Sequence, residues 1–286
     1  MARIAVVGSY GVGLTFELDR VPQRGETVTG TTFRTDPGGK GSNQAIGAAR
    51  LGAEVDLLTA VGEDAFGDGA IGLWRDEGVL ADGVVRSPLP TMVGAILVEP
   101  SGHNRIVIVP GALTALTPSH VDGFADAIAV ADLLLVQLEI PLETAQRALE
   151  RARRAGVRAI LNPAPAPPEA LPREVLELAD YVTPNETEAP AVQAAPGTLV
   201  VTIGHEGARL NDDPVPPFPA DCVDTTGAGD AFNAAFAVGL AEGLSDREAV
   251  QWGCAAGAHM VEHTGVVAGL PTRRQLEARL ARAPVG

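Results

Sequence analysis

An aspartate beside two glycines stands near the C-terminal end of the chain, in the stretch DTTGAGDAF (224–232). Gly227 and Gly229 would let backbone N–H groups approach an anion closely, and the helical pattern that follows adds the positive end of its dipole. A carboxylate at Asp230 would repel that anion unless it had another task, such as accepting a proton from an attacking alcohol. The segment therefore fits phosphoryl transfer. An N-capping aspartate beside a tight turn is the structural alternative.

The single lysine of the chain is a second candidate. Lys40 lies in GGKGSN, whereas the rest of the 21 basic residues are arginine. A lysine in a chain that otherwise uses arginine indicates a position that needs the compact ammonium group rather than the planar guanidinium group. A lysine kept by chance on a solvated loop is the alternative. The loop is not a nucleotide-binding P-loop, because Gly41 follows the lysine where that motif requires Ser or Thr.

The composition describes an acidic globular protein, and we expect a single domain over residues 1–286. With 46% apolar residues and a formal net charge of −15, the chain lacks the basic face that nucleic acid or an anionic membrane would require. Its apolar runs are too short to cross a bilayer. Cys222 and Cys254 cannot form a disulfide framework, and the chain begins without a secretory signal. We therefore expect buried thiols in a cytoplasmic protein.

Short apolar segments alternate with helical patterns along most of the chain. Strands of this kind, interleaved with helices, indicate a mainly parallel sheet covered on both faces. The expected strands are 4–8, 55–62, 133–139, 158–164, 181–185 and 198–204, and the expected helices are 42–50, 66–77, 119–129, 142–155, 174–178, 230–242 and 246–262. Two extended segments, 27–36 and 91–109, have no helix between their strands, which indicates a small second sheet.

Nine motifs in a fixed order carry a family resemblance. They are GETVTG, PGGKGSNQA, ARLGAEV, VGEDAFG, QLEIPLE, LNPAPA, TPNETEA, VTIGHEG and DTTGAGDAF. From Arg3 to about Pro271 the chain resembles the ribokinase-like (PfkB) family of carbohydrate and nucleoside kinases. The resemblance implies a ribokinase-like three-layer α/β/α fold with a mainly parallel sheet plus a small β-sheet lid, the lid formed by approximately residues 10–37 and 90–111. It also implies ATP-dependent phosphoryl transfer to a hydroxyl of a sugar or sugar-like molecule, and a homodimer through the lid.

The resemblance assigns roles to residues at the acceptor side. Asp230 corresponds to the general base, and the N–H groups of Gly227, Ala228 and Gly229 would face the transferred phosphate. The residues that correspond to the sugar-binding positions are Gly11, Gly13, Gly39, Lys40, Gly41, Asn43, Glu139 and Asp230. For Glu139, a solvated charge at a strand end is the alternative.

Further correspondences concern the nucleotide and metals. ATP would be bound by Asn185, Thr202, Gly204, Glu206, Gly207, Gly229 and Cys254. Asn185 and Glu188 would hold Mg²⁺ through water, although a simple helix start fits the same spacing. A monovalent cation, K⁺, would lie at Asp224, Thr226, Met260, His263, Gly265 and Gly269, mostly on carbonyl oxygens.

The chain departs from the family at two sugar-binding positions. Gly11 and Gly13 align with an Asn and an Asp that bind sugar hydroxyls, so we expect room for a different acceptor, including a nucleoside. The same stretch, GSYGVG, could instead be a dinucleotide-binding turn of a nicotinamide-dependent oxidoreductase. A catalytically silent sugar-binding protein is a third class. Between NETEA and TLVV the chain is short, so a helix usual in the family should be missing.

Overall fold

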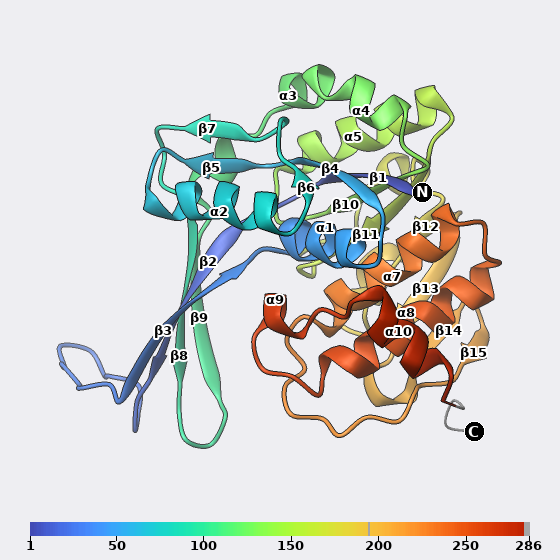
Figure 1. Ribbon diagram of the computed structural model, residues 1–286. Helices are drawn as coiled ribbons and strands as arrows, with labels where there is room; N and C mark the ends of the chain where they lie inside the picture. Colours follow the sequence, from blue (N-terminus) through green and yellow to red (C-terminus); the bar gives the residue numbers. More distant parts are fainter. Residues whose placement is uncertain (194, 283–286) are drawn as a thin grey trace.

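The computed structural model describes residues 1–193 and 195–282, and its core is a nine-stranded sheet with the strand order β15-β14-β13-β12-β11-β10-β1-β4-β6 (Figure 1). The parallel part comprises β1 (Arg3–Val7), β4 (Glu54–Leu58), β6 (Val79–Leu80), β10 (Leu133–Gln137), β11 (Arg158–Asn162), β12 (Tyr181–Val182) and β13 (Thr198–Thr202). A hairpin of β14 (Ala208–Leu210) and β15 (Asp213–Val215) adds two antiparallel strands at one edge. The expected α/β fold with a mainly parallel sheet is confirmed.

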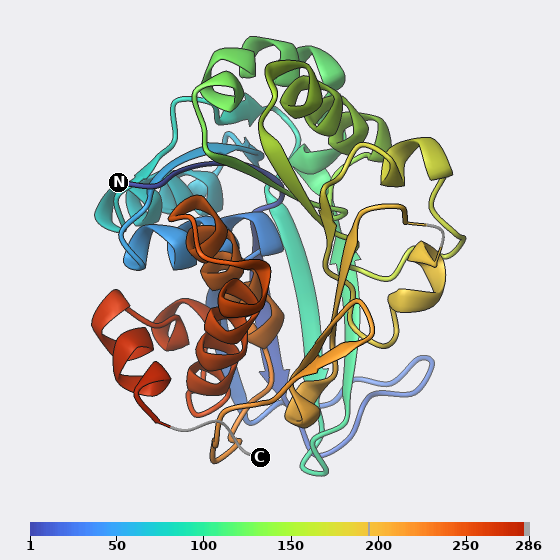
Figure 2. The same cartoon turned by 90° about the vertical axis from the view of Figure 1, so that its right-hand side faces the viewer.

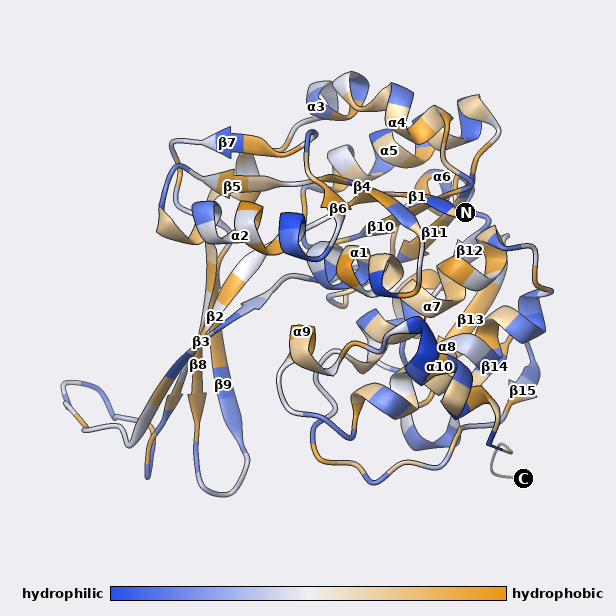
Figure 3. Ribbon diagram, viewed as in Figure 1, coloured by the Kyte–Doolittle hydropathy of each residue, from blue (hydrophilic) through white to orange (hydrophobic). Residues whose placement is uncertain are grey.

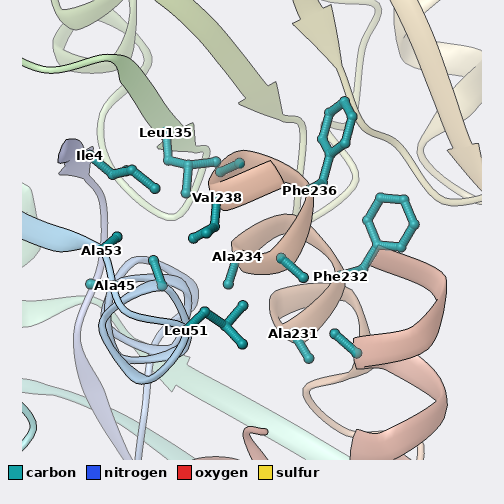
Figure 4. Close-up of a cluster of buried hydrophobic side chains, with 14 of the residues drawn as sticks. Ile4, Ala45, Leu51, Ala53, Leu135, Ala231, Phe232, Ala234, Phe236 and Val238 are labelled. Carbon is teal, nitrogen blue, oxygen red and sulfur yellow. The ribbon is translucent and has the colours of Figure 1, made fainter. Parts of the chain in front are cut away.

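Both faces of the central strands β1, β10 and β11 are buried, which explains why these strands are apolar without alternation. In β1, Ile4 and Val6 belong to one hydrophobic cluster, while Ala5 and Val7 belong to the cluster on the other face. Figure 4 shows Ile4 and Leu135 packed against side chains of the first cluster, including Ala45 and Val238. The two clusters make the sheet the middle of three layers (Figure 2).

The first cluster is completed by α1 (Lys40–Arg50), α2 (Ala65–Asp76), α7 (Ala228–Ala241), α8 (Asp246–Met260) and α10 (Arg273–Leu280). The second contains side chains of η1 (Gly111–Ala115), α3 (Pro118–Gly123), α4 (Ala125–Ala129), α5 (Leu142–Ala155) and α6 (Arg173–Leu176). Helix α7 is nearly all apolar or small and is buried along most of its length, because it lies between the sheet and α8. Helix α5 has the bounds that the sequence predicts.

A second, four-stranded sheet projects from the body at the left of Figure 1. Its strand order is β3 (Thr32–Gly38), β2 (Gly11–Glu17), β8 (Met92–Val98) and β9 (Asn104–Val109). Strands β2 and β8 are parallel, and the two outer pairs are antiparallel. Figure 3 shows long hydrophobic stretches on this sheet, notably in β8. We call this sheet the lid. Two short strands, β5 (Ala60–Gly62) and β7 (Val85–Ser87), pair beside its base.

Three local expectations are corrected or refined. The helix expected over 119–129 is broken into α3 and α4 at Phe124, which caps both segments. Between Asn185 and β13, the described residues form only a short 3₁₀ helix, η2 (Ala189–Val192), in line with the expected missing helix. Cys254 is buried, but Cys222 is exposed because it lies in the loop between β15 and α7. In the described part of the chain, no helix is long and apolar enough to cross a membrane.

The dinucleotide-binding interpretation of GSYGVG is wrong. Residues 11–17 continue as strand β2, which pairs with β3 on one side and β8 on the other. A pyrophosphate site of the dinucleotide type requires a helix N-terminus directly after the glycines. Here the chain after the glycines is a strand, so that geometry does not form.

Candidate active site

The predicted site residues gather at the carboxyl ends of the parallel strands, the edge where open α/β sheets bind ligands. Glu139 follows β10, Asn185 follows β12, and Thr202 ends β13. Helices α1 and α7 begin above this edge and pack against each other. Lys40 and Asp230, far apart in the sequence, are thereby brought to one place.

The turn before α7 depends on glycine. Gly227, the N-cap residue, has φ of 83°, and a Cβ there would lie 2.7 Å from Val266 Cγ1. Ala228 already donates its N–H to the carbonyl of Thr225 at 3.2 Å. At Gly229, a Cβ would meet no atom within 4 Å, so the space beside this exposed residue is open. Of the three predicted anion-binding amides, those of Gly227 and Gly229 are therefore better placed for a ligand than that of Ala228.

Asp230 is buried in the first turn of α7, with only 7% of its surface exposed. Asn43 Nδ2 donates to its Oδ2 at 2.8 Å, and Gln44 Nε2 donates to its Oδ1 at 3.0 Å. Burial raises the pKa of this carboxyl, and the positive charge of Lys40 together with the two amide hydrogen bonds lowers it only in part. A carboxylate with a raised pKa is suited to accepting a proton.

Lys40 begins α1 and lies among carboxylates. Its backbone N–H donates to Glu139 Oε2 at 2.9 Å. Burial alone would lower the pKa of the ammonium, but the charges of Asp230, Glu139 and Glu188 outweigh burial, so the pKa is raised. The lysine is therefore a stable positive charge in a site that holds three acids.

Two glycines let the lysine loop approach the chain after β1. Gly39 has φ of 90°, and a Cβ there would lie 2.6 Å from Tyr10 Cα. A Cβ at Gly41 would lie 2.5 Å from the backbone nitrogen of Ser9. The close approach is what brings Lys40 to Glu139, and no other residue type fits at either position.

Sequence reasoning missed a chain of buried amides behind Asp230. Gln137 Nε2 donates to Gln44 Oε1 at 2.7 Å, and Gln44 Nε2 donates to Asn162 Oδ1 at 3.1 Å as well as to Asp230. Asn162 Nδ2 in turn donates to the carbonyl of Thr183 at 2.8 Å. These partners fix which end of the Gln44 amide faces the aspartate. The available signal was an amide in an otherwise apolar or small stretch, as in NQAIGAA and LLLVQ.

Ser9 is another missed residue, and it shows which side of the lid faces the site. Its hydroxyl donates to Glu139 Oε2, whereas the next side chain, Tyr10, packs edge-on against Trp74 with ring centroids 5.1 Å apart. Val12 belongs to the same hydrophobic cluster as Tyr10 and Trp74. Successive side chains of an extended chain alternate between faces.

That alternation puts Gly11 and Gly13 on the side of Ser9. A Cβ at Gly11 would lie 2.3 Å from Met92 Cε, so the expectation of free space is wrong at this position: the methionine already occupies it. At Gly13 the nearest atom to a Cβ is Ile96 Cδ1 at 3.5 Å, an ordinary contact distance. The room left by the two glycines is therefore confined to the neighbourhood of Gly13.

In the NETE segment, Asn185 caps the following turn, and Glu188 is the candidate metal ligand. Asn185 Oδ1 accepts the N–H groups of Thr187 and Glu188, each at 2.9 Å, and Glu188 Oε2 accepts the N–H of Asn185 at 2.9 Å. Glu188 is nevertheless buried, and burial raises its pKa, with the Asn185 hydrogen bond and Lys40 acting in the opposite direction. Both lone pairs of the asparagine oxygen are thus used, while the negative charge of Glu188 interacts with the charges of Lys40 and Asp230.

The predicted nucleotide segment lies beside NETE. The N–H of Thr202 donates to the carbonyl of Pro184 at 3.0 Å, and Thr202 forms a parallel bridge with Asn185. The turn beyond it is η3 (Gly204–Glu206), with φ of 55° at Gly204 and 93° at Gly207. Cys254 lies on α8 in the first hydrophobic cluster, which also contains Ala208 at the start of β14, and burial raises the pKa of its thiol to about 12.

The positions expected to hold a monovalent cation lie on two neighbouring loops. Val261 accepts the N–H of Asp224 at 3.1 Å, and Asp224 Oδ1 accepts the N–H of Thr226 at 2.9 Å. The other positions run from Met260, which ends α8, through His263 and Gly265 in the connecting loop to Gly269, which ends α9 (Val266–Gly269). Among the described residues, no three His, Cys, Asp or Glu side chains gather as a metal-binding group.

Known proteins match the chain over nearly its whole length. The model of the pfkB family carbohydrate kinases matches residues 1–273. A ribokinase of Bacillus subtilis is 39% identical over 98% of this chain and 100% of its own length. A deoxyribokinase of Salmonella typhi is 35% identical over 82% of this chain and 84% of its own. The solved structure of Arabidopsis thaliana ribokinase complexed with ribose and ATP is 31% identical, with a TM-score of 0.91 and coverage of 99% and 100%.

The chain therefore belongs to the pfkB family of carbohydrate kinases. It is an ATP-dependent kinase that phosphorylates a hydroxyl of a sugar or sugar-like small molecule, and its ribokinase-like fold, expected from the motifs, is confirmed. The interpretation as a catalytically silent binding protein is not supported by these relatives.

Proposed function

We propose that the enzyme transfers the γ-phosphoryl group of ATP directly to a hydroxyl of a sugar or sugar derivative, with Asp230 as the general base. The observation that carries this proposal is the buried Asp230 carboxylate, held by Asn43 and Gln44 at the N-terminus of α7. A base placed in this way takes the acceptor proton as the acceptor oxygen attacks phosphorus. Positioning and charge stabilisation then suffice, and no phosphoenzyme is needed.

Charge on the transferring phosphoryl group would be met from two sides. The N–H groups of Gly227 and Gly229 and the α7 dipole lie on one side. Lys40, whose pKa is raised by its acidic neighbours, supplies a full positive charge on the other. The acceptor would lie between this loop, Glu139 and the lid.

Glu188 is the residue that fits Mg²⁺. It is buried, faces the charges of Lys40 and Asp230, and would bind the ion through water, as Mg²⁺ usually keeps much of its hydration shell. When bound, the ion neutralises phosphate oxygens of ATP. Asn185 would contribute by holding Glu188 in place, because its own oxygen caps two backbone N–H groups.

For K⁺, the candidate segments are the turn of Asp224 and Thr226 and residues 260–269, which the hydrogen bond from the Asp224 N–H to the carbonyl of Val261 joins. We place the cation there because it would steady the turn before α7. Activity in K⁺ should exceed that in Na⁺ at equal ionic strength, and equal activity in the two salts would remove this assignment.

A nucleoside is the alternative acceptor. The open space at Gly13 is the observation that favours it, since a base attached to a ribose needs more room than a hydroxyl. A ribokinase and a deoxyribokinase are both among the relatives, so the panel of acceptors described below includes pentoses as well as ribonucleosides.

A homodimer through the lid fits the outer side of that sheet. Phe33, Val107 and Val109 point away from the site and are 59%, 64% and 49% exposed. An apolar sheet face next to the free edge of β9 favours pairing with a second copy. Light scattering should give twice the 29.4 kDa chain mass. We place the enzyme in the cytoplasm, where ATP is supplied and its free thiols stay reduced.

The experiment that tests the proposal is ADP release with a panel of pentoses, hexoses, polyols and ribonucleosides, with the product identified by mass spectrometry. The wild type should phosphorylate at least one of them, and Asp230→Asn should abolish transfer while keeping ATP binding in calorimetry. Asp76→Asn removes an exposed carboxylate that, among the described residues, pairs with its neighbour Arg75, and it is the matched control. Turnover by Asp230→Asn at the wild-type rate would exclude the base assignment.

A further inference from the structure

We propose that Asp36, on the lid strand β3, supplies the carboxylate that binds acceptor hydroxyls. It lies opposite Gly13, which has no side chain to do so. This inference rests on the proposed function, in which the acceptor lies between the lid and Asp230. It makes Asp36 a residue that determines which acceptor is bound.

The strand register places Asp36 on the same face of the lid as Gly13. Gly13 pairs with Asp36 of β3 in the antiparallel pair and with Gly94 of β8 in the parallel pair. Residues directly opposite each other in neighbouring strands point to the same side of a sheet. Gly13 lies on the side of Ser9, whose hydroxyl bonds Glu139, and Asp36 therefore points to the side of the candidate active site.

The distance across the pair is short enough for one carboxylate to replace another. Opposite residues have Cβ atoms about 4.5–5.5 Å apart, so a side chain at Asp36 starts one strand away from a side chain at position 13. A Cβ at Gly13 meets only Ile96 Cδ1 at 3.5 Å and Asp36 O at 3.7 Å. At Gly94, a Cβ would meet no atom within 4 Å. Two adjacent glycines thus leave an opening into which the Asp36 carboxylate, or a substrate group beside it, can extend.

The carboxylate is oriented yet still available. Arg34 lies two residues before Asp36 on the same face. Its Nε–H donates to Asp36 Oδ2 at 3.1 Å, and its Nη1 donates to Glu17 Oε1 at 3.2 Å. The Asp36 side chain is 45% exposed. A carboxylate has about four acceptor positions, so the arginine leaves several for hydroxyl groups. The Arg34 guanidinium thus holds the Asp36 carboxylate beside the opening and leaves acceptor positions of that carboxylate unoccupied.

The chemistry of this row of residues defines the class of acceptor. A carboxylate that accepts from two adjacent hydroxyls recognises a diol, and the opening at Gly13 and Gly94 admits a substituent next to that diol. Met92 fills the corresponding space beside Gly11, so the acceptor hydroxyls would be bound at Asp36 and not at the Gly11 position. The inference is a polyhydroxylated acceptor whose diol lies against β3.

The test compares Asp36→Ala and Asp36→Asn with the control Asp76→Asn, using the best acceptor of the panel and its monodeoxy analogues. Loss of a hydrogen bond to a charged group costs roughly ten- to a hundred-fold in binding, so KM for the acceptor should rise by that factor. The kcat and the KM for ATP should stay within about twofold, because Asp36 is not assigned to the transfer step. Removing one diol hydroxyl should weaken the wild type but not Asp36→Ala.

A second variant guards against a merely structural effect. Gly13→Asp combined with Asp36→Ala returns the carboxylate to β2 and should recover part of the lost acceptor affinity, with a melting temperature near that of wild type. An acceptor KM within twofold of wild type in Asp36→Ala, or equal losses for diol and deoxy acceptors, overturns the role of Asp36 while leaving the kinase assignment intact. If the wild type phosphorylates nothing in the panel, the proposed function fails and this inference fails with it.

Discussion

Gln44 and Asp230, 186 residues apart in the sequence, are joined by a hydrogen bond of 3.0 Å from Gln44 Nε2 to Asp230 Oδ1. The glutamine cannot turn its amide round, because its oxygen accepts from Gln137 Nε2. Its NH₂ group also donates a hydrogen bond to Asn162 Oδ1. The orientation of the proposed base is therefore set from the strands of the central sheet, through an amide on the lysine-bearing helix.

Replacing Gln44 should affect the base without touching the substrate. In Gln44→Leu, Asp230 loses one of two donors to its charged form, so its pKa should rise and kcat should fall by roughly ten- to a hundred-fold. The pH profile of kcat/KM measures both effects. Gln146→Leu, which removes a half-buried amide that donates to Glu150 on the same helix, is the control. If the acidic limb of the kcat/KM profile of Gln44→Leu lies at the same pH as in the wild type, the Gln44–Asp230 hydrogen bond is only structural.

The pH dependence follows from the raised pKa of Asp230. Transfer needs the ionised carboxylate, so kcat/KM should fall as pH decreases, with a midpoint above 3.8, the ordinary value for aspartate. Lys40→Met removes the charge that favours ionisation and should move this midpoint to still higher pH. A midpoint that stays in place, or that moves downward, would contradict the electrostatic role of Lys40 whatever the loss of rate.

Glu188→Gln should raise the Mg²⁺ concentration needed for half-maximal activity, by roughly tenfold for the loss of a charged ligand contact. Titration of activity with Mg²⁺ at fixed ATP measures this. The comparison variant is Asn185→Ala, which mainly removes a cap and should cost about 1 kcal/mol of stability. Equal Mg²⁺ requirements in wild type and Glu188→Gln would remove the glutamate from the metal site.

Gly39→Ala should destabilise the fold by more than 1 kcal/mol, roughly the cost of a left-handed residue plus a steric clash. The glycine has φ of 90°, and its new Cβ would lie 2.6 Å from Tyr10 Cα. Gly69→Ala is the matched control: it lies in α2 with no atom within 4 Å of the added Cβ. That change should stabilise the protein by about 0.5–1 kcal/mol. Urea unfolding distinguishes them, and a neutral Gly39→Ala would contradict the close packing of the lysine loop.

The sequence by itself determined the α/β class, the family, and the residues Lys40, Glu139, Glu188 and Asp230 as site candidates. Local chemistry was enough for the α/β class and for Lys40 and Asp230, because apolar strands between helices encode a buried parallel sheet and glycines before a helix encode an anion-binding turn. The family, Glu139 and Glu188 came from the resemblance carried by the ordered motifs. The exact bounds of α5 were also readable from its periodic pattern.

Only the tertiary structure decided how these residues work together. The amide chain from Gln137 to Asp230 depends on which side chains two strands and a helix bring into one buried space, and no local pattern encodes that. The same holds for Met92 beside Gly11 and Asp36 beside Gly13, since both contacts are set by strand register. Register is fixed by pairing between distant segments, which a single sequence does not display.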